Sequence, residues 1–594
     1  MRIRKRFTAM LLALAFVLTT VIGGISVHAS EDFPLVGSGT NHLGMLQIEK
    51  KDAAGNPLAG AGFSLYKIMD LTPRDATDPL KGYDFSITSG FETVLGDLDP
   101  DVLGNYSTAQ IEALTQNILT RIETAPTIAA TVTTNLTDEN GYTEAIAGYG
   151  YYLVVETTVP ANYTGSQPFF VALPSTDNYA GGVDGEGNPI KTPGKNWLSV
   201  ITVKPKNSLV SVTKQITNAN NDHEYGTDFT PDTRYKNSDT VAVGDLVTYQ
   251  ITASVPAYTA DYFANAGNPS REATFILRDV LSPGLQLVDP ANSNKPYAMT
   301  PLTDILVRAR NTTTSAEVTL EKDVDYEILA VNATGNDPDL TVKLTQAFLA
   351  NPENHGKLLI VDYAAKVTSD AVIGIGPDPE NPGNPNKVWL TYNNAPNVTT
   401  KTADIIKRVF TFQLNIGKIN EQNIPLAGAK FDLYKAALDG EEVEGVWTEI
   451  PGARVPGTKI AEGIETTNTG LLQFPRVDAG TYFLVETESP AGYKLLTSMV
   501  KIQIEAPKDV NGDTNGVIKM YVDGKEITAA EQTVENPESY VCSVTGVAHL
   551  TVVNRPGFTL PATGGMGIAI FLAVAFIGMI SVTVFLVKKK RAQA

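Results

Sequence analysis

The chain has 594 residues, of which 65 are Asp or Glu and 46 are Lys or Arg, so its formal net charge is −19. This length is enough for three or four domains. So acidic a chain does not suit nucleic acid, and it favours a soluble surface protein whose copies repel one another. Its single cysteine, Cys542, excludes an internal disulfide, so an exported chain would need another device for its stability.

Residues 1–29 predict a signal peptide. A basic start precedes an apolar segment from about Phe7 to Val27; the basic residues are Arg2, Arg4, Lys5 and Arg6. Val27-His28-Ala29 then has the small residues of a cleavage site. We therefore expect an exported protein that begins near Ser30.

Most of the remaining chain consists of short runs in which polar and apolar residues alternate, as in 247–252 and 411–416. Such runs are typical of strands, and their spacing is that of β-sandwiches. One helix is predicted over Ser107–Glu123, with Ser107 as its N-cap. Its apolar stripe would serve packing; it comprises Ile111, Leu114, Ile118 and Ile122. We predict a mainly β chain of tandem Ig-like sandwiches in an elongated rod, with this helix inserted in the first.

The chain contains an internal repeat. Residues 46–67 match residues 414–435 almost one for one at a constant offset. A second matching pair, Tyr152–Thr157 and Tyr482–Thr487, follows at a smaller offset. One domain is therefore duplicated, and its first copy carries an insertion that contains the predicted helix.

Both copies place ionisable residues on apolar strand faces. Alternation puts Lys50 and Lys418 on the face of their apolar neighbours, and Glu156 and Glu486 on the face of a tyrosine. A buried lysine loses its proton readily and becomes a nucleophile. A buried Lys–Glu ion pair, or a pair of snorkelling surface side chains, fits the same pattern.

The pattern Tyr-x-Leu-Val-Glu-Thr-x-x-Pro-x-x-Tyr, which ends at Tyr493, resembles the E-box of CNA-B (collagen-adhesin B-type) domains in sortase-assembled pilins. The resemblance implies a spontaneous, single-turnover isopeptide bond between Lys and Asn, with no cofactor. The Glu would polarise the Asn carbonyl and shuttle a proton while ammonia leaves. The implied sets are Lys50, Asn207 and Glu156 in the first copy, and Lys418, Asn554 and Glu486 in the second. Asn162 stands in the first copy where the family commonly shows Gly.

Four segments between the copies resemble the middle domain of the same pilins: residues 212–214, 243–249, 275–279 and 390–396. This similarity implies that Lys214 bonds to Asn394 with Asp279 as the acid. Asn393 and Asp245 are alternatives for the amide and the acid.

Residues Trp197–Lys206 resemble the pilin motif WxxxVxVYPK, with Ile201 for Val and Lys204 for Tyr. The implied acceptor is Lys206, whose amine would attack the sortase-bound Thr563 of another subunit. Pro205 would break the strand ladder so that Lys206 emerges at a strand end. Lys204 is the alternative acceptor.

The C-terminal region resembles an LPxTG cell-wall sorting signal. The pentapeptide consists of Leu560, Pro561, Ala562, Thr563 and Gly564. It precedes an apolar run, Met566–Val587, long enough to span a bilayer, and a basic end, Lys588–Arg591, expected to stay cytoplasmic. The resemblance implies that a sortase cleaves after Thr563.

These patterns together indicate the backbone subunit of a covalent surface pilus, and not an enzyme. The predicted parts are the signal peptide (1–29), three sandwich domains (30–207, 208–404 and 405–556) and the sorting signal with its transmembrane segment and basic tail (557–594). The implied partners are a pilin-class sortase, a housekeeping sortase, identical subunits, minor pilins, peptidoglycan and a host surface ligand, with no nucleic acid. The alternative is a monomeric wall-anchored adhesin built of CNA-B domains.

No metal site is expected. Asp509, Asn511, Asp513 and Asn515 have the spacing of a calcium loop. The sixth position holds Thr514 where that loop needs Gly, and no Glu closes it, so we interpret the segment as a surface turn.

Overall fold

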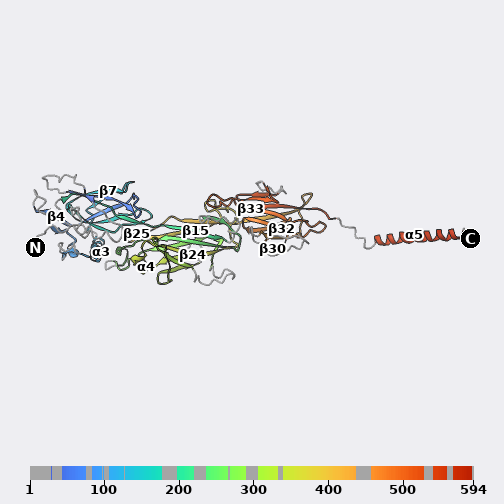
Figure 1. Cartoon of the computed structure of the whole chain (residues 1–594), viewed down its shortest axis with the longest axis horizontal. Coiled ribbons are helices and arrows are strands. Elements are labelled where there is room, and N and C mark those ends of the chain that lie inside the picture. The colour runs from blue at the N-terminus through green and yellow to red at the C-terminus, as the bar shows by residue number, and fades with distance from the viewer. Residues whose placement is uncertain are drawn as a thin grey trace, which may run out of the picture. The chain divides into compact units, whose positions relative to one another are not determined.

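A computed structural model describes the following residues: 28–29, 43–74, 83–96, 98, 106–125, 127–176, 197–219, 236–264, 268–288, 305–331, 339–436, 457–527, 539–557 and 566–591. They form mainly strands, which confirms the predicted fold class (Figure 1). The chain divides into two compact units. Unit 1 comprises residues 1–217, 246–366 and 385–407, and unit 2 comprises residues 218–245, 367–384 and 408–594.

The first copy of the repeat, residues 43–209, lies in unit 1 together with β1, which precedes it, and its described residues form two main sheets. In one sheet the order is β1-β13-β2-β7, and in the other β10-β8-β4-β5. Its strands are β1 (His28–Ala29), β2 (Leu43–Glu49), β3 (Lys51–Asp52), β4 (Gly62–Pro73), β5 (Tyr83–Ile87), β6 (Val132–Thr133), β7 (Tyr142–Gly148), β8 (Gly150–Thr158), β9 (Tyr163–Thr164), β10 (Phe169–Leu173), β11 (Ser175–Thr176), β12 (Trp197–Leu198), β13 (Val200–Val203) and β14 (Lys206–Leu209). Residues of both sheets, such as Leu46, Ile48, Phe63 and Val154, form one buried apolar cluster.

The described residues of the insertion in the first copy include the helices α2 (Glu92–Leu95) and α3 (Thr108–Thr124), and α3 is the predicted one. Ser107 caps α3 in a capping box: the Gln110 backbone N–H donates to Ser107 Oγ, and the Ser107 N–H donates to Gln110 Oε1. Ile111 and Ile118 are buried in a second apolar cluster, which includes Tyr151 and Phe170. The predicted stripe therefore packs against strands β8 and β10.

The middle segment, residues 210–404, contributes two further sheets to unit 1. In one the order is β15-β17-β24-β20-β21, and the other contains β25-β18-β23-β22 with β26 beside β25. The strands are β15 (Val212–Ala219), β17 (Leu246–Ser254), β18 (Phe275–Leu281), β19 (Leu285–Val288), β20 (Leu306–Arg310), β21 (Glu317–Thr319), β22 (Tyr326–Val331), β23 (Leu340–Leu344), β24 (Leu358–Val367), β25 (Asn384–Ala395) and β26 (Val398–Lys401). Three short helices accompany them: η6 (Ala260–Tyr262), α4 (Gln346–Ala350) and η8 (Pro352–Asn354).

The second copy, residues 412–557, lies in unit 2. Its sheets have the orders β31-β28-β37-β36 and β30-β29-β32-β33-β34-β35, and they enclose one core. The strands of the unit are β16 (Ser238–Thr240), β27 (Ile405–Phe410), β28 (Phe412–Asn420), β29 (Lys430–Lys435), β30 (Thr458–Glu465), β31 (Leu471–Val477), β32 (Gly480–Glu488), β33 (Val500–Glu505), β34 (Lys519–Val522), β35 (Lys525–Ile527), β36 (Tyr540–Cys542) and β37 (Val547–Asn554).

A strand near the start and a strand near the end of each copy are parallel neighbours. In the first copy β2 pairs with β13, and in the second β28 pairs with β37. This arrangement brings the start and the end of each copy to one place in the sheet, as a bond between them requires.

The predicted apolar C-terminal run forms a helix, α5 (Met566–Arg591). In contrast to the predicted transmembrane segment, none of the helices that the structure describes is both long and apolar enough to cross a membrane. The predicted signal peptide up to Val27 and the pentapeptide 560–564 lie outside the described residues.

The cap of α3 gives a first prediction. Ser107→Ala removes the side-chain acceptor and should destabilise the first turn by about 1 kcal/mol, which corresponds to roughly fivefold faster amide exchange. Hydrogen exchange of the α3 amides measures this, and Ser107→Asp is the matched control because it retains an acceptor. Equal amide exchange rates in wild type and Ser107→Ala would show that the cap does not stabilise the first turn.

Candidate functional site

The first copy brings Lys50, Glu156 and Asn207 together, as predicted. All three are buried, with Lys50 fully enclosed. Lys50 Nζ lies 2.8 Å from Glu156 Oε2, and Asn207 Nδ2 donates to Glu156 Oε1 over 2.8 Å. The carboxylate therefore touches both the amine and the amide with different oxygens.

The surroundings of this triad fix the carboxylate and favour a neutral amine. Ser166 donates to Glu156 Oε2 through its backbone N–H and its hydroxyl. The Phe63 ring lies 5.4 Å from Lys50 Nζ. Burial lowers the pKa of Lys50 more than the charge of Glu156 raises it. The amine is thus more nucleophilic than that of an exposed lysine.

The second copy brings Lys418, Glu486 and Asn554 together in the same way. Lys418 Nζ donates to Asn554 Oδ1 over 2.5 Å and lies 3.1 Å from Glu486 Oε1. Asn554 Nδ2 donates to the same Glu486 Oε1 over 2.9 Å. Burial lowers the pKa of Lys418 as well, against the opposing charge of Glu486.

The two triads occupy equivalent positions in the repeat. Glu156 pairs with Phe63, and Glu486 pairs with Phe431, whose ring lies 5.4 Å from Lys418 Nζ. Each asparagine pairs with the residue two positions after its lysine, as Asn207 does with Asp52 and Asn554 with Asn420. Strand register therefore places the same three groups together twice.

This geometry refines the expected chemistry. In both copies the carboxylate accepts from the asparagine amide nitrogen, whereas the sequence-based mechanism had it polarise the carbonyl. A carboxyl group so placed can take a proton from the attacking amine and pass it to the departing nitrogen. In the second copy the carbonyl oxygen of Asn554 faces the Lys418 amine instead.

The middle segment buries a third lysine beside an acid. Lys214 on β15 forms an ion pair with Asp279 on β18, and both are almost fully enclosed. The rings of Tyr249 and Tyr363 lie 5.1 and 5.5 Å from Lys214 Nζ. Burial lowers the pKa of Lys214 to about 8 and raises the pKa of Asp279. Asp245, the alternative acid, instead accepts the backbone N–H of Ala242.

The predicted partner of Lys214, Asn394, does not lie at this site. On β25, Val388 pairs with Asp279 and Tyr392 pairs with Phe275, so Asn394 is about 20 Å along the sheet from Asp279. The backbone oxygen of Asn394 accepts from Gly165 N–H and Tyr262 Oη.

Asn393, the alternative amide, is used elsewhere in the sheet. Its Oδ1 accepts from the Thr274 N–H, and its Nδ2 donates to Val398 O and Thr399 Oγ1. The register of β25 therefore overturns the amide expected from the resemblance.

The asparagine at the middle site is Asn386, which the sequence reasoning missed. It is fully buried, and its Nδ2 donates over 2.9 Å to Tyr363 Oη, which donates over 2.9 Å to Asp279 Oδ1. Alternation in β25 places Asn386 on the inward face with Val388 and Leu390, but Asn394 has the same parity, so only the register with β18 distinguishes them.

The two candidate acceptor lysines differ in their contacts. Lys204 lies between β13 and β14 and forms an ion pair of 2.7 Å with Glu49. Lys206, the first residue of β14, is half-buried and makes no side-chain hydrogen bond or ion pair with other described residues. Asn207 points inward, so its neighbour Lys206 points the other way. Of the two candidates, only Lys204 is therefore held in an ion pair with another described residue.

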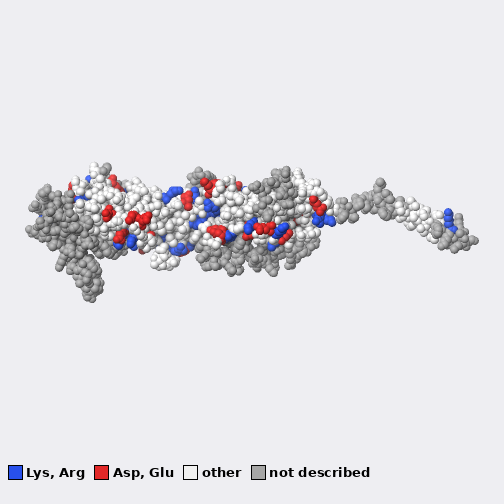
Figure 2. Space-filling view, turned by 90° about the horizontal axis from the view of Figure 1, so that it is seen from above, with Lys and Arg blue, Asp and Glu red and all other residues white. Residues whose placement is uncertain are grey.

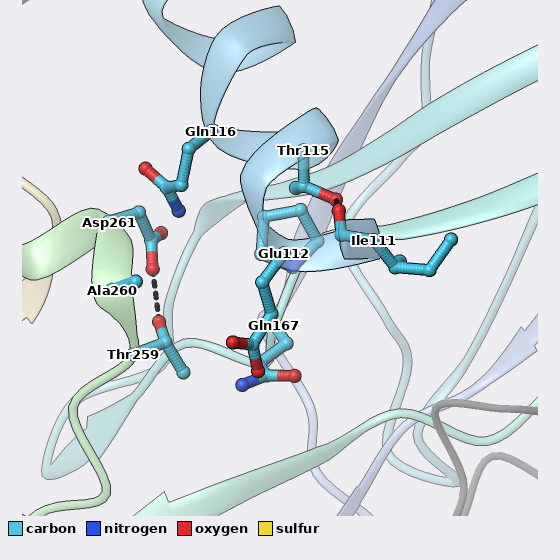
Figure 3. A pocket seen from close by; sticks show the side chains of 9 residues that line it. Ile111, Glu112, Thr115, Gln116, Gln167, Thr259, Ala260 and Asp261 are labelled. Atoms are coloured by element: carbon cyan, nitrogen blue, oxygen red, sulfur yellow. Dashed lines mark hydrogen bonds between the residues drawn. The ribbon is translucent and has the colours of Figure 1, made fainter. Parts of the chain in front are cut away.

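A small pocket in unit 1 lies between α3 and η6, lined in part by Gln116, Gln167 and Asp261 (Figure 3). Its volume of about 30 Å³ leaves room for water but not for a substrate. The face drawn in Figure 2 mixes acidic and basic side chains among the described residues. In the segment with calcium-loop spacing, Asp509 Oδ1 accepts the backbone N–H groups of Asn511 and Asp513, as in a turn, and Asp513 Oδ1 accepts those of Asn237 and Ser238.

Comparisons with known proteins agree with the repeat. The profile of the SpaA domain, a prealbumin-like fold domain, matches residues 44–184 and 412–516. The chain is 23% identical over 354 residues to the trypsin-resistant surface T6 protein of Streptococcus pyogenes serotype M6, covering 54% of this chain and 51% of that one. It is 24% identical over 481 residues to the fimbrial subunit type 1 of Actinomyces viscosus. That match covers 75% of this chain and 73% of the fimbrial subunit.

Two solved structures of similar proteins cover most of the chain. The T6 backbone pilin of serotype M6 S. pyogenes aligns with a TM-score of 0.49 and 18% identity, over 86% of this chain and 99% of that one. The full-length major pilin SpaD of Corynebacterium diphtheriae aligns with a TM-score of 0.47 and 18% identity. The alignment covers 86% of this chain and 98% of that one.

Both copies of the repeat therefore match the model of a prealbumin-like fold domain. The relatives of the chain are surface and fimbrial proteins, and its structural neighbours are major pilins of Gram-positive bacteria. The predicted resemblance is confirmed at the level of these sequence relatives. The chain spans about half the length of the T6 protein and nearly three quarters of the fimbrial subunit.

The position of Asn386 gives a second prediction. If Lys214 bonds to Asn386, the wild-type chain is lighter than its calculated mass by one ammonia for this bond. In Asn386→Ala that deficit should disappear, and the Lys214 peptide should be released from its cross-link in a tryptic digest. Asn394→Ala should leave the cross-link intact. Intact mass and peptide mapping of the full chain measure both. A cross-link lost in Asn394→Ala and kept in Asn386→Ala would contradict the geometry.

The lowered pKa of Lys214 gives a third prediction. In Asn386→Ala the lysine stays free, with a pKa of about 8 when folded and its ordinary value of 10.5 when unfolded. Between these values the unfolded state binds more protons, so stability should rise with pH across that window. Pulse proteolysis of the middle segment in urea measures the trend.

The matched control for this trend is Lys214→Met combined with Asn386→Ala, which has no titrating amine at the site. Its stability should stay level over the same window. A slope of the same size in both variants would assign the trend to other groups.

Proposed function

We propose that this chain is the backbone subunit of a covalent surface pilus, stabilised by internal Lys–Asn isopeptide bonds. The observation that supports it most strongly is the burial of three lysines, each with an acid and an asparagine, in three separate sandwiches. The proposed bonds join Lys50 to Asn207, Lys214 to Asn386 and Lys418 to Asn554.

The burial of each triad is better explained by bond formation than by an ion pair alone. Taking a lysine and a carboxylate out of water costs several kcal/mol per ion, which the pair recovers only in part. An isopeptide bond removes the charge of the amine and releases ammonia, so the enclosed site ends with neutral groups. Each bond would close a loop of more than a hundred residues, worth about 5 kcal/mol in a chain-entropy estimate.

We propose further that a pilin-class sortase joins subunits by transferring the acyl group of Thr563 to the amine of Lys206. The half-buried Lys206, which points away from the core beside the buried Asn207, supports this choice, as does the ion pair that occupies Lys204. A housekeeping sortase would then attach the fibre to peptidoglycan through the same threonine. Minor pilins and a host surface ligand would complete its partners.

The acceptor assignment gives a fourth prediction. In cells that assemble the fibre, Lys206→Ala should abolish the high-mass ladder of wall extracts and leave wall-attached monomer, because the acyl group then lacks its amine. Lys204→Ala is the matched control and should leave the ladder intact. A ladder that survives Lys206→Ala but not Lys204→Ala would reverse the assignment, and wild-type extracts without a ladder would favour a monomeric adhesin.

A further inference from the structure

The middle triad differs from the other two in having a phenol between its acid and its asparagine. In both copies of the repeat a Glu oxygen accepts directly from the asparagine Nδ2. In the middle segment Asp279 makes no such contact, and Tyr363 Oη stands between the two groups with a hydrogen bond of 2.9 Å on either side. The three residues are almost fully buried.

Strand topology explains why a bridge is needed. Asp279 and Asn386 lie on neighbouring strands of one sheet, where Asn386 pairs with Leu281 and Asp279 with Val388. Residues related by such a diagonal are about 7–8 Å apart, beyond the reach of a short Asp side chain to an amide. Tyr363 comes from β24 in the other sheet, and its hydroxyl fills that space.

We propose that Tyr363 is a catalytic residue that relays a proton from Asp279 to the departing nitrogen of Asn386. This inference rests on the proposed Lys214–Asn386 bond and names the residue that makes it form. The rings nearest Lys50 and Lys418 are Phe63 and Phe431, which have no hydroxyl to offer.

The step balances without any further reactant. The neutral Lys214 amine attacks Cγ of Asn386, so an N–C bond forms and the carbonyl becomes tetrahedral. With Asp279 protonated on Oδ1 and Asn386 Nδ2 turned into an amine by the attack, both hydrogen bonds of Tyr363 reverse from the directions seen in the unreacted site. The Lys214 nitrogen then gives a proton to Asp279 Oδ2, Asp279 gives its Oδ1 proton to Tyr363 Oη, and Tyr363 gives its own proton to Asn386 Nδ2. The C–Nδ2 bond then breaks, ammonia leaves, and both Asp279 and Tyr363 end in their starting protonation state.

The environment of Tyr363 suits this role. Its ring stacks on Tyr249 with 5.4 Å between centroids, which holds the hydroxyl in place. Burial and the neighbouring Asp279 raise the pKa of Tyr363 well above its ordinary value, so the phenol keeps a proton to donate at neutral pH. Burial also raises the pKa of Asp279, which favours the protonated acid that begins the relay.

The test compares Tyr363→Phe with wild type in the full chain, synthesised cell-free in detergent and sampled over time. The yield of the tryptic peptide that links Lys214 to Asn386 measures bond formation. Loss of the relay should slow that bond on the order of 10²-fold, the usual contribution of a general acid. The bonds at Lys50 and Lys418 in the same samples should form at the wild-type rate.

Two further variants separate chemistry from packing. Tyr392→Phe is the matched control, because it removes a hydroxyl from a buried tyrosine of the same sandwich that pairs with Phe275, four residues before Asp279 on β18; it should leave the rate unchanged. Asp279→Glu in the Tyr363→Phe background lengthens the acid by one methylene, so that it can reach Asn386 as Glu486 reaches Asn554. It should restore the bond, which a merely structural defect would not allow.

Three outcomes would overturn the relay, and they are distinguishable. A wild-type chain without the Lys214–Asn386 peptide would remove the proposed middle bond and the relay with it. A bond that forms at the wild-type rate in Tyr363→Phe would remove the relay alone. Slow formation that Asp279→Glu fails to restore would assign Tyr363 to packing.

Discussion

A lysine amine enclosed with a carboxyl group and an amide is the constraint on which the described structure depends. Each such amine loses its hydration on folding, and the acid beside it offsets only part of that loss. The chain nevertheless builds this arrangement three times, at Lys50, Lys214 and Lys418, within apolar cores and against aromatic rings. A costly feature that recurs around three lysines is what the proposed bond formation would require, since the reaction needs a neutral amine beside a protonated acid.

The strand pairing around these amines decides what a bond at each place would resist. In the second copy, Lys418 and Asn554 lie on β28 and β37, adjacent parallel strands of one sheet, so a bond would lock that ladder against sliding. In the middle segment, Lys214 and Asn386 belong to different sheets, so a bond would hold the two layers of the sandwich together. The same chemistry thus opposes shear in one case and separation of sheets in the other. Both would strengthen a chain that has one cysteine and no internal disulfide.

The sequence predicts well what depends on local periodicity. Alternation alone indicates that Lys50 and Lys418 share a face with core residues, and the cap and apolar stripe of α3 follow from its own residues. The duplication then transfers each assignment from one copy to the other. The equivalent pairing of Glu156 with Phe63 and of Glu486 with Phe431 reflects that duplication.

The same reasoning fails where the answer depends on register between distant strands. Asn386, Asn393 and Asn394 all lie on β25, and nothing local to that strand says which of them stands near Asp279. The pairing of Asp279 with Val388 settles it, and that pairing is set by contacts between strands more than a hundred residues apart in the chain. Tyr363 was missed for a related reason, because a tyrosine on an alternating strand is most often a core residue. Only the hydrogen bonds from Asn386 and to Asp279 distinguish it from Tyr249, the ring stacked against it.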